Sequence, residues 1–570
     1  MKPDNQTKLG NNLALLYGKN AKPTTETLIK LVESWKPRIH KLRKFWNEKD
    51  SVLITYGDPI ETNSETGIPL LDRFLCNYVG NAINIIHILP FYPSTSDRGF
   101  SVINFREVSN SQGNWDDIQS VGKKYRLVFD CVINHVSKSS AYVKGHLSRS
   151  KEYENYCIEH QPSFDYSNVM RPRTSPLFHT YESKKGEVQL WTTFSEDQVD
   201  LNFSNPRVLI ELMDVILFYA SKGASVIRLD AIPYLWKESG TSCVHLQQTH
   251  AFIRIIRIIL NEAAPHVLIL SETNVPHNEN LTYFGTQANE AQIIYNFSLP
   301  PLILYALTHT DTEPLTRWAK TLKAPSDRCT FLNITSTHDG IGLRPVEGIL
   351  TKEQINSLVN ITLSHQGHVS YKSNSDGSKS PYELNITFYD AINDPTDHKL
   401  STEVQVLKFL VSQATAMALA GVPGIYFNSL LGLRNNQKEH EVKREINRGK
   451  VRLAEIEKNL RDPESPMYKV FHGIKSLLEK RKSESSFHPN SENTVLDLGR
   501  HIFAVWRCNH ETNEMLLALH NFRDEALVCT LPNELHHYHY TDILDPDSSI
   551  KPPNILMPAY GIRWLKITEE

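Results

Sequence analysis

The chain has 570 residues, of which 40% are hydrophobic and 22% are charged, and its formal net charge is −3. This length supplies a large apolar core, either in one big domain with insertions or in two to three domains. The small net charge argues against a nucleic acid or an anionic membrane as a partner.

Signals for export and for disulfide formation are also missing. The first residues, Met1 to Gln6, contain no apolar signal-peptide core, and no apolar run is long enough to cross a bilayer. We therefore expect a cytoplasmic protein. The seven cysteines are scattered and include no CxxC pair, which predicts reduced thiols and neither a disulfide framework nor a zinc site.

Strand and helix patterns alternate along most of the chain. The expected elements are a strand over 82–89, a helix beginning near Trp115, a strand over 127–133, a helix over 206–219, a strand over 225–229, a helix over 251–260, a strand over 267–270, a helix over 404–419 and a strand over 420–427. Repeated βα units in a chain of this size favour a (β/α)8 TIM barrel. A doubly wound sheet is the weaker alternative, because no glycine-rich phosphate loop follows the early strands.

Three segments interrupt this alternation. Residues 137–205 lack a long helix pattern and are expected to form a small inserted domain on the active-site side. Residues 343–395 are expected to form an active-site loop insertion. Short strands with turns predict a C-terminal antiparallel β domain over 490–570. The catalytic barrel is then expected to comprise residues 1–136 and 206–489.

Two polar stretches within the second part of the barrel carry their own predictions. Residues 370–383 are rich in serine, asparagine and lysine, and they have the composition of a loop throughout. Residues 438–461 are dense in glutamate, lysine and arginine, which predicts a helix with a largely solvated face.

Four apolar runs end at polar residues suited to chemistry. In the run over 223–231, Arg228 and Asp230 are two apart on a strand, so their side chains leave the same face. A cation beside a carboxylate favours the ionised form that a nucleophile needs. Such a pair alone is more often structural, but three further runs show the same design. They cover residues 126–135, 267–274 and 331–340.

In a barrel, the carboxyl ends of different strands meet at one mouth. The residues expected there are Asp130, His135, Arg228, Asp230, Glu272, His338 and Asp339. Glycosyl transfer needs one ionised and one protonated carboxyl group. Asp230 suits the nucleophile, and Glu272 follows an apolar strand that would raise its pKa, which suits the acid. Asp339 with His338 is expected to bind sugar hydroxyls, and Phe100 suits the apolar face of a sugar, although packing is the commoner role of such an aromatic.

These segments resemble the four shared motifs of the α-amylase superfamily (glycoside hydrolase family 13), in the order of that family. The matching segments are Asp130 to His135, Gly223 to Asp230, Glu272 to Asn274 and Thr337 to Asp339. The resemblance implies a (β/α)8 barrel with a small domain after the third strand and a C-terminal β domain. It also implies that Asp230 is the nucleophile, Glu272 the acid/base and Asp339 the transition-state stabiliser.

More of the chain is similar to one branch of that superfamily, the sucrose phosphorylases and their relatives. The similar segments are 89–102, 171–176, 191–195, 235–243 and 380–385. Such enzymes form a covalent glucosyl-enzyme and pass glucose to inorganic phosphate with retention, giving α-glucose 1-phosphate. The resemblance implies phosphate as co-substrate and no further cofactor. The only hint of a metal site is the group of Asp, His and Asn near 130–135, which shows no clear ligand spacing.

The same resemblance names the residues that bind the substrates. Asp97 and Arg434 would hold the glucose end of the pocket, and Arg171 or Arg173 would meet phosphate or the acceptor. Pro172 stiffens the backbone between these two guanidinium groups, each of which can bind an oxyanion bidentately. The full set of expected substrate-binding residues is Asp97, Phe100, His135, Arg171, Arg173, Arg228, His338 and Arg434.

The sequence leaves the acceptor open. The 171–176 segment, Arg-Pro-Arg-Thr-Ser-Pro, resembles the glucosylglycerate phosphorylases and the phosphosucrose-using enzymes more than plain sucrose phosphorylase. We therefore expect 2-O-α-glucosylglycerate as substrate, ahead of sucrose or sucrose 6-phosphate. An α-glucoside hydrolase or transglucosidase and a catalytically silent barrel are further alternatives, the last opposed by the three carboxylates. The expected partners are a small-molecule glucoside and phosphate, in a monomer or homodimer.

Three positions depart from the pattern of the branch. Asn104 stands in place of an aspartate, Pro233 in place of a glycine, and Gln247 in place of a proline. None of them removes a catalytic carboxylate. Pro233, close behind the expected nucleophile, is expected to shift the pocket wall and so the choice of acceptor.

Overall fold

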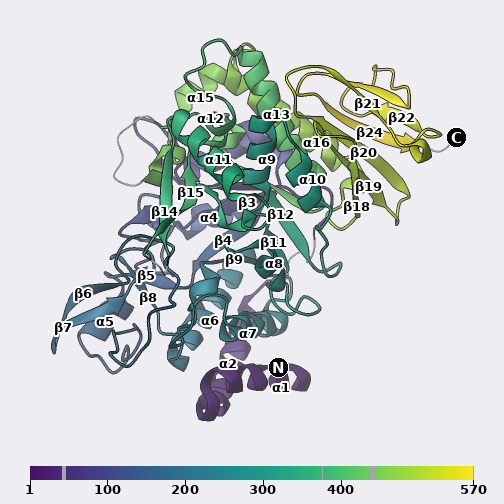
Figure 1. Cartoon of the computed structure of the whole chain (residues 1–570). Helices are drawn as coiled ribbons and strands as arrows, with labels where there is room; N and C mark the ends of the chain where they lie inside the picture. Colours follow the sequence, from purple (N-terminus) through teal and green to yellow (C-terminus); the bar gives the residue numbers. More distant parts are fainter. Residues whose placement is uncertain (41–45, 375–376, 437–442, 569–570) are drawn as a thin grey trace.

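Eight parallel strands close into a barrel at the centre of the chain, which we describe from a computed structural model covering residues 1–40, 46–374, 377–436 and 443–568 (Figure 1). In sequence order the barrel strands are β1 (Val52–Thr55), β3 (Ile85–Ile88), β4 (Arg126–Val132), β9 (Ala224–Asp230), β10 (Leu268–Ser271), β11 (Ile293–Tyr295), β12 (Thr330–Ile334) and β16 (Val422–Tyr426). The predicted (β/α)8 barrel is confirmed. Strands β1 and β11 have no counterpart among the strands expected from the sequence, and β12 was expected only as the apolar run over 331–340.

Helices surround the barrel, so the strands are covered on their outer face as well. The flanking helices include α3 (Ile68–Phe74), α4 (Trp115–Gly122), α6 (Pro206–Ser221), α7 (Gln247–Ala263), α8 (His277–Thr282), α9 (Leu299–His309), α10 (Glu313–Ala319), α13 (Thr402–Ala418) and α16 (Pro466–Lys482). All seven residues of β9 are buried. Burial on both faces explains why the barrel strands read as continuous apolar runs instead of alternating patterns.

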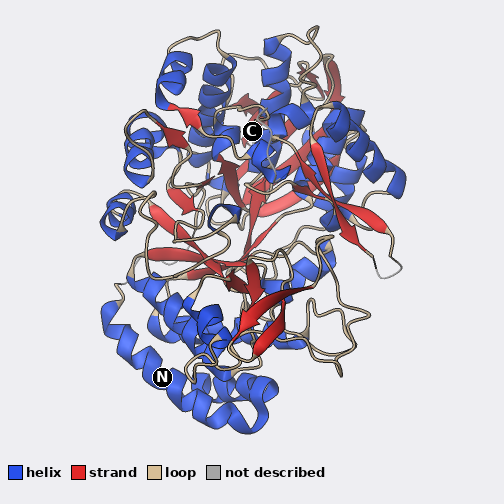
Figure 2. Cartoon of the chain, turned by 90° about the vertical axis from the view of Figure 1, so that its left-hand side faces the viewer, coloured by secondary structure: helices blue, strands red, loops and turns tan. Residues whose placement is uncertain are grey.

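Two helices precede the barrel, although the barrel was expected to begin at the start of the chain. They are α1 (Pro3–Tyr17) and α2 (Ala21–Trp35), which pack against each other and against α6 and α7 (Figure 1). Figure 2 shows the N-terminus within a group of helices at the lower left of the molecule. Leu9, Leu13 and Leu28 are fully buried in these contacts. The two helices therefore extend the outer layer of the barrel.

The segment 137–205 leaves the barrel after β4 and contains two small antiparallel pairs. Its elements, with the strand that begins just before it, are β5 (His135–Ser137), α5 (Ala141–Leu147), β6 (Phe178–Ser183), β7 (Gly186–Trp191) and β8 (Gln198–Asp200). Strand β5 pairs with β8, and β6 pairs with β7. This arrangement returns residues near 195–200 to the mouth of the barrel.

The segment 343–395 is more ordered than a loop insertion. Its elements, together with the strand just before it, are β13 (Ile341–Gly342), α11 (Lys352–Ser364), β14 (His368–Ser373), β15 (Lys379–Asn385) and α12 (Phe388–Ile392). The three strands form one antiparallel sheet, so the prediction of a loop over 370–383 was wrong. Val369, Tyr382 and Leu384 are buried and hold the hairpin, whereas the polar residues that suggested a loop lie nearer its tip.

The charged stretch over 438–461 also differs from the expected helix. After β16 come α14 (Phe427–Leu430), a short 3-10 turn over Lys443–Asn447, β17 (Val451–Arg452) and α15 (Leu453–Leu460). Strand β17 pairs with β2 (Ile60–Glu61). Only the second half of the stretch is helical, and residues 437–442 lie outside the described residues.

A β-rich unit follows α16 at the C-terminal end of the chain (Figure 1). Its strands are β18 (Glu492–Asp497), β19 (Ile502–Asn509), β20 (Glu514–Asn521), β21 (Leu527–Thr530), β22 (His539–Asp542), β23 (Asn554–Met557) and β24 (Ile562–Thr568). Five of them form one antiparallel sheet, and β21 pairs with β23. Across the described ranges of the chain, we find no helix that is both long and apolar enough to span a membrane.

Candidate active site

The carboxyl ends of the barrel strands open into a cavity of about 540 Å³, a volume within the range of about 300–1,000 Å³ common for small-molecule sites. Its lining includes eight residues expected from the sequence: Asp97, Phe100, His135, Arg173, Asp230, Glu272, His338 and Asp339. They come from segments far apart in the chain, which the barrel brings together. Pro233 also lines the cavity, as its position after Asp230 suggested.

Asp230 is the last residue of β9 and lies beside a buried cation. The Arg228 Nη1 donates to Asp230 Oδ1 at 2.8 Å and also to Asp130, which accepts from His87 Nε2 at 2.6 Å if the imidazole is protonated there. Burial raises the pKa of Asp230, and the positive charge of Arg228 opposes that rise. Arg228 favours the ionised form of Asp230, as expected from the sequence, but burial outweighs it and the nearby charge of Asp130 adds to the rise.

Glu272 directly follows β10 and has a different environment. Its Oε2 accepts a hydrogen bond from the Ala231 amide at 2.8 Å, and it forms no direct ion pair among the described residues. Burial raises the pKa of Glu272 to about 7, with Arg228 opposing and Asp230 adding to the rise. The prediction of a raised pKa is confirmed. A carboxyl group that keeps its proton near neutral pH can serve as a general acid.

Asp339 lies after β12 and is surrounded by positive charge. Arg444 Nη1 is 2.6 Å from its Oδ1, and Arg448 Nη2 is 3.5 Å from the same atom. Burial alone would raise the pKa of Asp339, but Arg444, His338 and Arg448 outweigh it and lower the pKa. Burial lowers the pKa of His338 to about 3, so its imidazole is neutral at neutral pH. Asp339 is thus an anion, and its charge adds to the rise in the pKa of Glu272.

Asp97 is held in place by Arg448. Arg448 Nη1 donates to Asp97 Oδ1 at 2.8 Å, and burial of Asp97 is outweighed by Arg448 and Arg444, which lower its pKa. Asp97 and Arg98 both have positive φ, 49° and 48°. Two consecutive non-glycine residues in this conformation store backbone strain, which is common where a functional side chain must be aimed.

Aromatic and imidazole groups form one wall of the cavity. The rings of Phe100 and His338 stack at 4.7 Å with an interplanar angle of 3°, and the Arg228 guanidinium lies 5.7 Å from the Phe100 ring centre. His135 Nε2 lies 3.0 Å from the Phe100 carbonyl oxygen and 3.2 Å from Gln198 Nε2. An apolar ring face beside polar edges suits a sugar, which has both kinds of surface.

One arginine of the expected pair lines the cavity. Arg173 Nη1 lies 3.4 Å from Glu383 Oε2, and its guanidinium lies 5.8 Å from the ring centre of Tyr382. Arg171 does not line the cavity; its side chain donates to the Ser175 carbonyl of the same segment. Of the two arginines, Arg173 is therefore the one placed to contact a molecule in the cavity.

Arg434 is placed elsewhere by the structure, and this expectation needs correction. Its side chain is exposed at the surface and pairs with Asp390 at 2.8 Å, outside the cavity lining. The arginines that pair with Asp339 and Asp97 are Arg444 and Arg448, which lie ten and fourteen residues further on. Tyr389 attracts Arg434 instead, with the guanidinium 5.2 Å from its ring centre.

Three charged residues of the site were not identified from the sequence. Arg444 and Arg448 belong to a stretch whose charge density predicted a solvated helix, and Glu383 belongs to the predicted loop. Glu383 is 2% exposed and accepts from the Gly340 amide at 2.9 Å and from Arg444 at 3.1 Å. The alternation of apolar and polar residues over 382–385 was a usable signal, because Tyr382 and Leu384 on either side of Glu383 indicate a strand there and not a loop.

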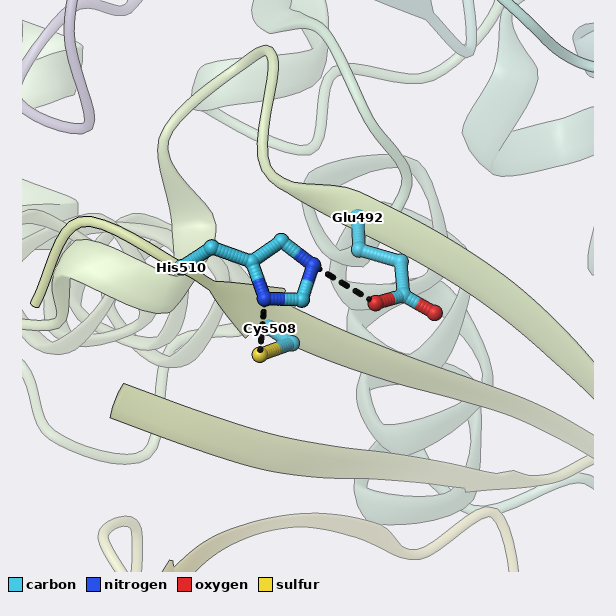
Figure 3. A group of neighbouring side chains, drawn as sticks. All are labelled: Glu492, Cys508 and His510. Atoms are coloured by element: carbon cyan, nitrogen blue, oxygen red, sulfur yellow. Dashed lines mark hydrogen bonds and ion pairs between the residues drawn. The ribbon is translucent and has the colours of Figure 1, made fainter. Parts of the chain in front are cut away.

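Among the described residues, no three His, Cys, Asp or Glu side chains of this cavity bring their ligand atoms close enough together to share a metal ion. Asp130 belongs to the group near 130–135 that was considered as a metal site, and its two carboxylate oxygens contact Arg228 and His87. Across the described ranges, the group close enough to share an ion lies in the C-terminal sheet and comprises Glu492, Cys508 and His510 (Figure 3). His510 Nε2 lies 3.0 Å from Glu492 Oε2, and His510 Nδ1 lies 3.6 Å from Cys508 Sγ, so the two neighbours contact different ring nitrogens.

Comparison with known proteins agrees with this geometry. The family described as "Alpha amylase, catalytic domain" matches residues 78–339. A glucosylglycerate phosphorylase of Spirochaeta thermophila is 41% identical over 97% of this chain and 97% of its own length. That of Escherichia coli is 37% identical over 98% and 100%. Among solved structures, the sucrose 6F-phosphate phosphorylase from Thermoanaerobacter thermosaccharolyticum is 23% identical and covers 85% of this chain and 95% of its own, with a TM-score of 0.72.

Proposed function

The chain belongs to the α-amylase superfamily and to its sucrose phosphorylase-like subfamily, and on this premise we propose that it is a glucosylglycerate phosphorylase. It transfers glucose from 2-O-α-glucosylglycerate to inorganic phosphate and releases α-glucose 1-phosphate and glycerate. The observation that carries this proposal is the identity of 37–41% with three proteins of that name over 87–98% of the chain.

The reaction proceeds by double displacement with retention. Asp230 attacks the anomeric carbon while Glu272 donates its proton to the leaving glycerate oxygen. Asp339 and Asp97, held as anions by Arg444 and Arg448, stabilise the positive charge that develops on the sugar ring. Phosphate then replaces glycerate, and Glu272, now ionised, accepts the proton of the attacking phosphate oxygen. Glucosyl-Asp230 is the intermediate that links the two steps.

Positive charge at the mouth suits both anionic acceptors. Arg173 lines the cavity and has one long contact, at 3.4 Å, with the carboxylate of Glu383. Its remaining N–H groups have no partner among the described residues, so they can meet the glycerate carboxylate or a phosphate oxygen bidentately. Sucrose has no anionic group for this arginine to bind.

A donor comparison tests the substrate. Glucosylglycerate, sucrose and sucrose 6-phosphate are each incubated with the enzyme at saturating phosphate, and α-glucose 1-phosphate formation is measured. We expect the highest kcat/KM for glucosylglycerate and a loss of about tenfold or more for it in Arg173→Gln. A higher kcat/KM for sucrose or its phosphate would refute the proposed substrate, and phosphate-independent release of glucose would indicate a hydrolase.

We also place the enzyme in the cytoplasm, where phosphate and phosphorylated sugars are available. The seven cysteines are all free. Reduced thiols are usual for proteins of that compartment. Cell fractionation with an antibody against the chain tests this placement, and recovery in the periplasmic or secreted fraction would contradict it.

A further inference from the structure

Six arginines among the described residues are buried, and they differ in their partners. Arg228 and Arg448 pair with carboxylates of the active site. The other four have no carboxylate within ion-pair distance in the described part of the chain, and they are Arg257, Arg344, Arg481 and Arg507. A buried guanidinium without a counter-ion is costly, so its charge must be offset by hydrogen bonds or serve a purpose.

Arg344 makes the fewest hydrogen bonds of these four. Arg481 donates to four backbone carbonyls, and Arg257 donates to one carbonyl and to one side-chain amide. Arg344 makes a single hydrogen bond, from Nη1 to the Asn274 carbonyl at 3.3 Å, and its Nε has no partner. Hydrogen bonds to the protein therefore offset little of the free-energy cost of burying the Arg344 guanidinium.

The position of Arg344 relates it to the active site. It begins a 3-10 turn, Arg344–Val346, two residues after Gly342, which lines the cavity. Asn274, whose carbonyl it binds, also lines the cavity, and the Asn274 side chain donates to the Tyr382 hydroxyl at 3.2 Å. Burial raises the pKa of Tyr234, another lining residue, and Arg344 opposes that rise. The guanidinium thus lies directly behind this wall.

We propose that Arg344 is a specificity-determining residue whose uncompensated positive charge, acting through the wall of Tyr234, Asn274 and Tyr382, favours anionic acceptors over neutral ones. The inference rests on the proposed function, in which glycerate and phosphate exchange places on glucosyl-Asp230. Arg173 contacts the anion directly, and Arg344 stabilises it from behind the wall. Buried protein between a fixed charge and a ligand screens less than water does, so the attraction is retained.

The test uses a neutral donor, α-glucosyl fluoride, with three acceptors. Inorganic phosphate and glycerate are anions, and glycerol is a neutral analogue of glycerate. In Arg344→Met we expect the KM for phosphate and for glycerate to rise about tenfold, with the kcat/KM for glycerol unchanged. Arg344→Lys, which keeps the charge, should retain most of the preference. Arg344→Gln, which keeps a donor for the Asn274 carbonyl without the charge, should behave as Arg344→Met and replaces it if that variant does not fold.

A matched control is available at the other end of the same strand. Arg257 donates to the carbonyl of Val267, just before β10, as Arg344 donates to that of Asn274, just after it. Arg257→Met therefore removes a similar buried charge away from the cavity, and we expect an unchanged KM for phosphate. The inference is overturned if Arg344→Met affects glycerol and phosphate equally, if it leaves the KM for phosphate unchanged, or if Arg257→Met has the same effect.

These outcomes separate the role of Arg344 from the proposed substrate. If wild-type enzyme does not transfer glucose to glycerate but Arg344→Met still raises the KM for phosphate, the substrate assignment fails and the role of Arg344 stands. If wild-type enzyme uses glycerate and Arg344→Met leaves both anion KM values unchanged, the substrate assignment stands and the role of Arg344 fails.

Discussion

At the scale of single residues, two buried carboxyl groups take opposite roles because their partners differ. Asp230 receives a hydrogen bond from a guanidinium, whereas Glu272 receives one from a backbone amide. Both pKa values are raised by burial, but only Asp230 has a directly bonded cation to favour its ionised form. The proton therefore remains on Glu272, as an acid catalyst requires.

The pH dependence of kcat/KM follows from these two groups. The acid Glu272 must be protonated, so activity falls as pH rises through its pKa of about 7. The nucleophile Asp230 must be ionised, and because burial raises its pKa, activity is lost on the acid side at a higher pH than for an exposed aspartate. We expect a bell-shaped profile, measured by α-glucose 1-phosphate formation at subsaturating donor.

A variant identifies the group behind the basic limb. Glu272→Gln with α-glucosyl fluoride needs no acid for its leaving group, so its profile should lack the fall near pH 7. Persistence of that fall in the variant would assign it to another residue.

The position of the three carboxylates was predictable from the sequence because each lies at or after the end of an apolar strand. In a parallel barrel, chain position alone then places Asp230, Glu272 and Asp339 at one mouth. Their pKa values were less accessible. The raised pKa of Glu272 was predictable from its burial. The sharing of Arg228 between Asp130 and Asp230 was not, because it depends on how β4 and β9 are aligned, and the sequence pattern does not determine that alignment.

At the scale of elements, the turn over Lys443–Asn447 with the following Arg448 supplies the cations that pair with Asp339 and Asp97. Closely spaced charges predicted a solvated helix there, because local pattern cannot distinguish arginines that face water from those that face carboxylates of distant segments. Arg444 and Arg448 pair with Asp339 and Asp97, more than 100 and 350 residues away. Such long-range partners are visible only after the barrel is assembled.

A pair of arginine substitutions tests the role of this turn. Arg448→Met leaves Asp97 without its main cation, and we expect a loss of stability of about 3–5 kcal/mol and a fall in kcat/KM of at least about tenfold. Arg434→Met is the control, because Arg434 pairs with Asp390 outside the cavity, and its KM for the donor should be unchanged. Urea unfolding and donor kinetics measure both effects. Equal kinetic effects of the two substitutions would contradict the assignment of Arg448.

At the scale of the whole molecule, the barrel was predictable because apolar patterns of strand length and of helix length alternate along the sequence. The two helices before it were not recognised, since nothing in α1 and α2 distinguishes an outer layer from the barrel's own helices. Their apolar faces lie on α6 and α7, on the outside of the barrel. We therefore assign them to stability and not to catalysis.

Two leucines of α1 test this assignment. Leu13 is fully buried and Leu15 is 43% exposed. We expect Leu13→Ala to cost about 2–5 kcal/mol and Leu15→Ala less than about 0.5 kcal/mol, with the same kcat in both variants at 25 °C. Urea midpoints and initial rates provide the comparison, and a lowered kcat in folded Leu13→Ala would connect this layer to the active site.

The central claim is that glucose is held on Asp230 and released by phosphate. Glu272→Gln is incubated with α-glucosyl fluoride without phosphate, so that the intermediate forms and its hydrolysis is slow, and the protein is analysed by mass spectrometry with peptide mapping. We predict the addition of one glucosyl unit on the peptide containing Asp230, lost on addition of phosphate with formation of α-glucose 1-phosphate. A glucosyl unit on another residue, or an adduct that phosphate does not discharge, would contradict the account.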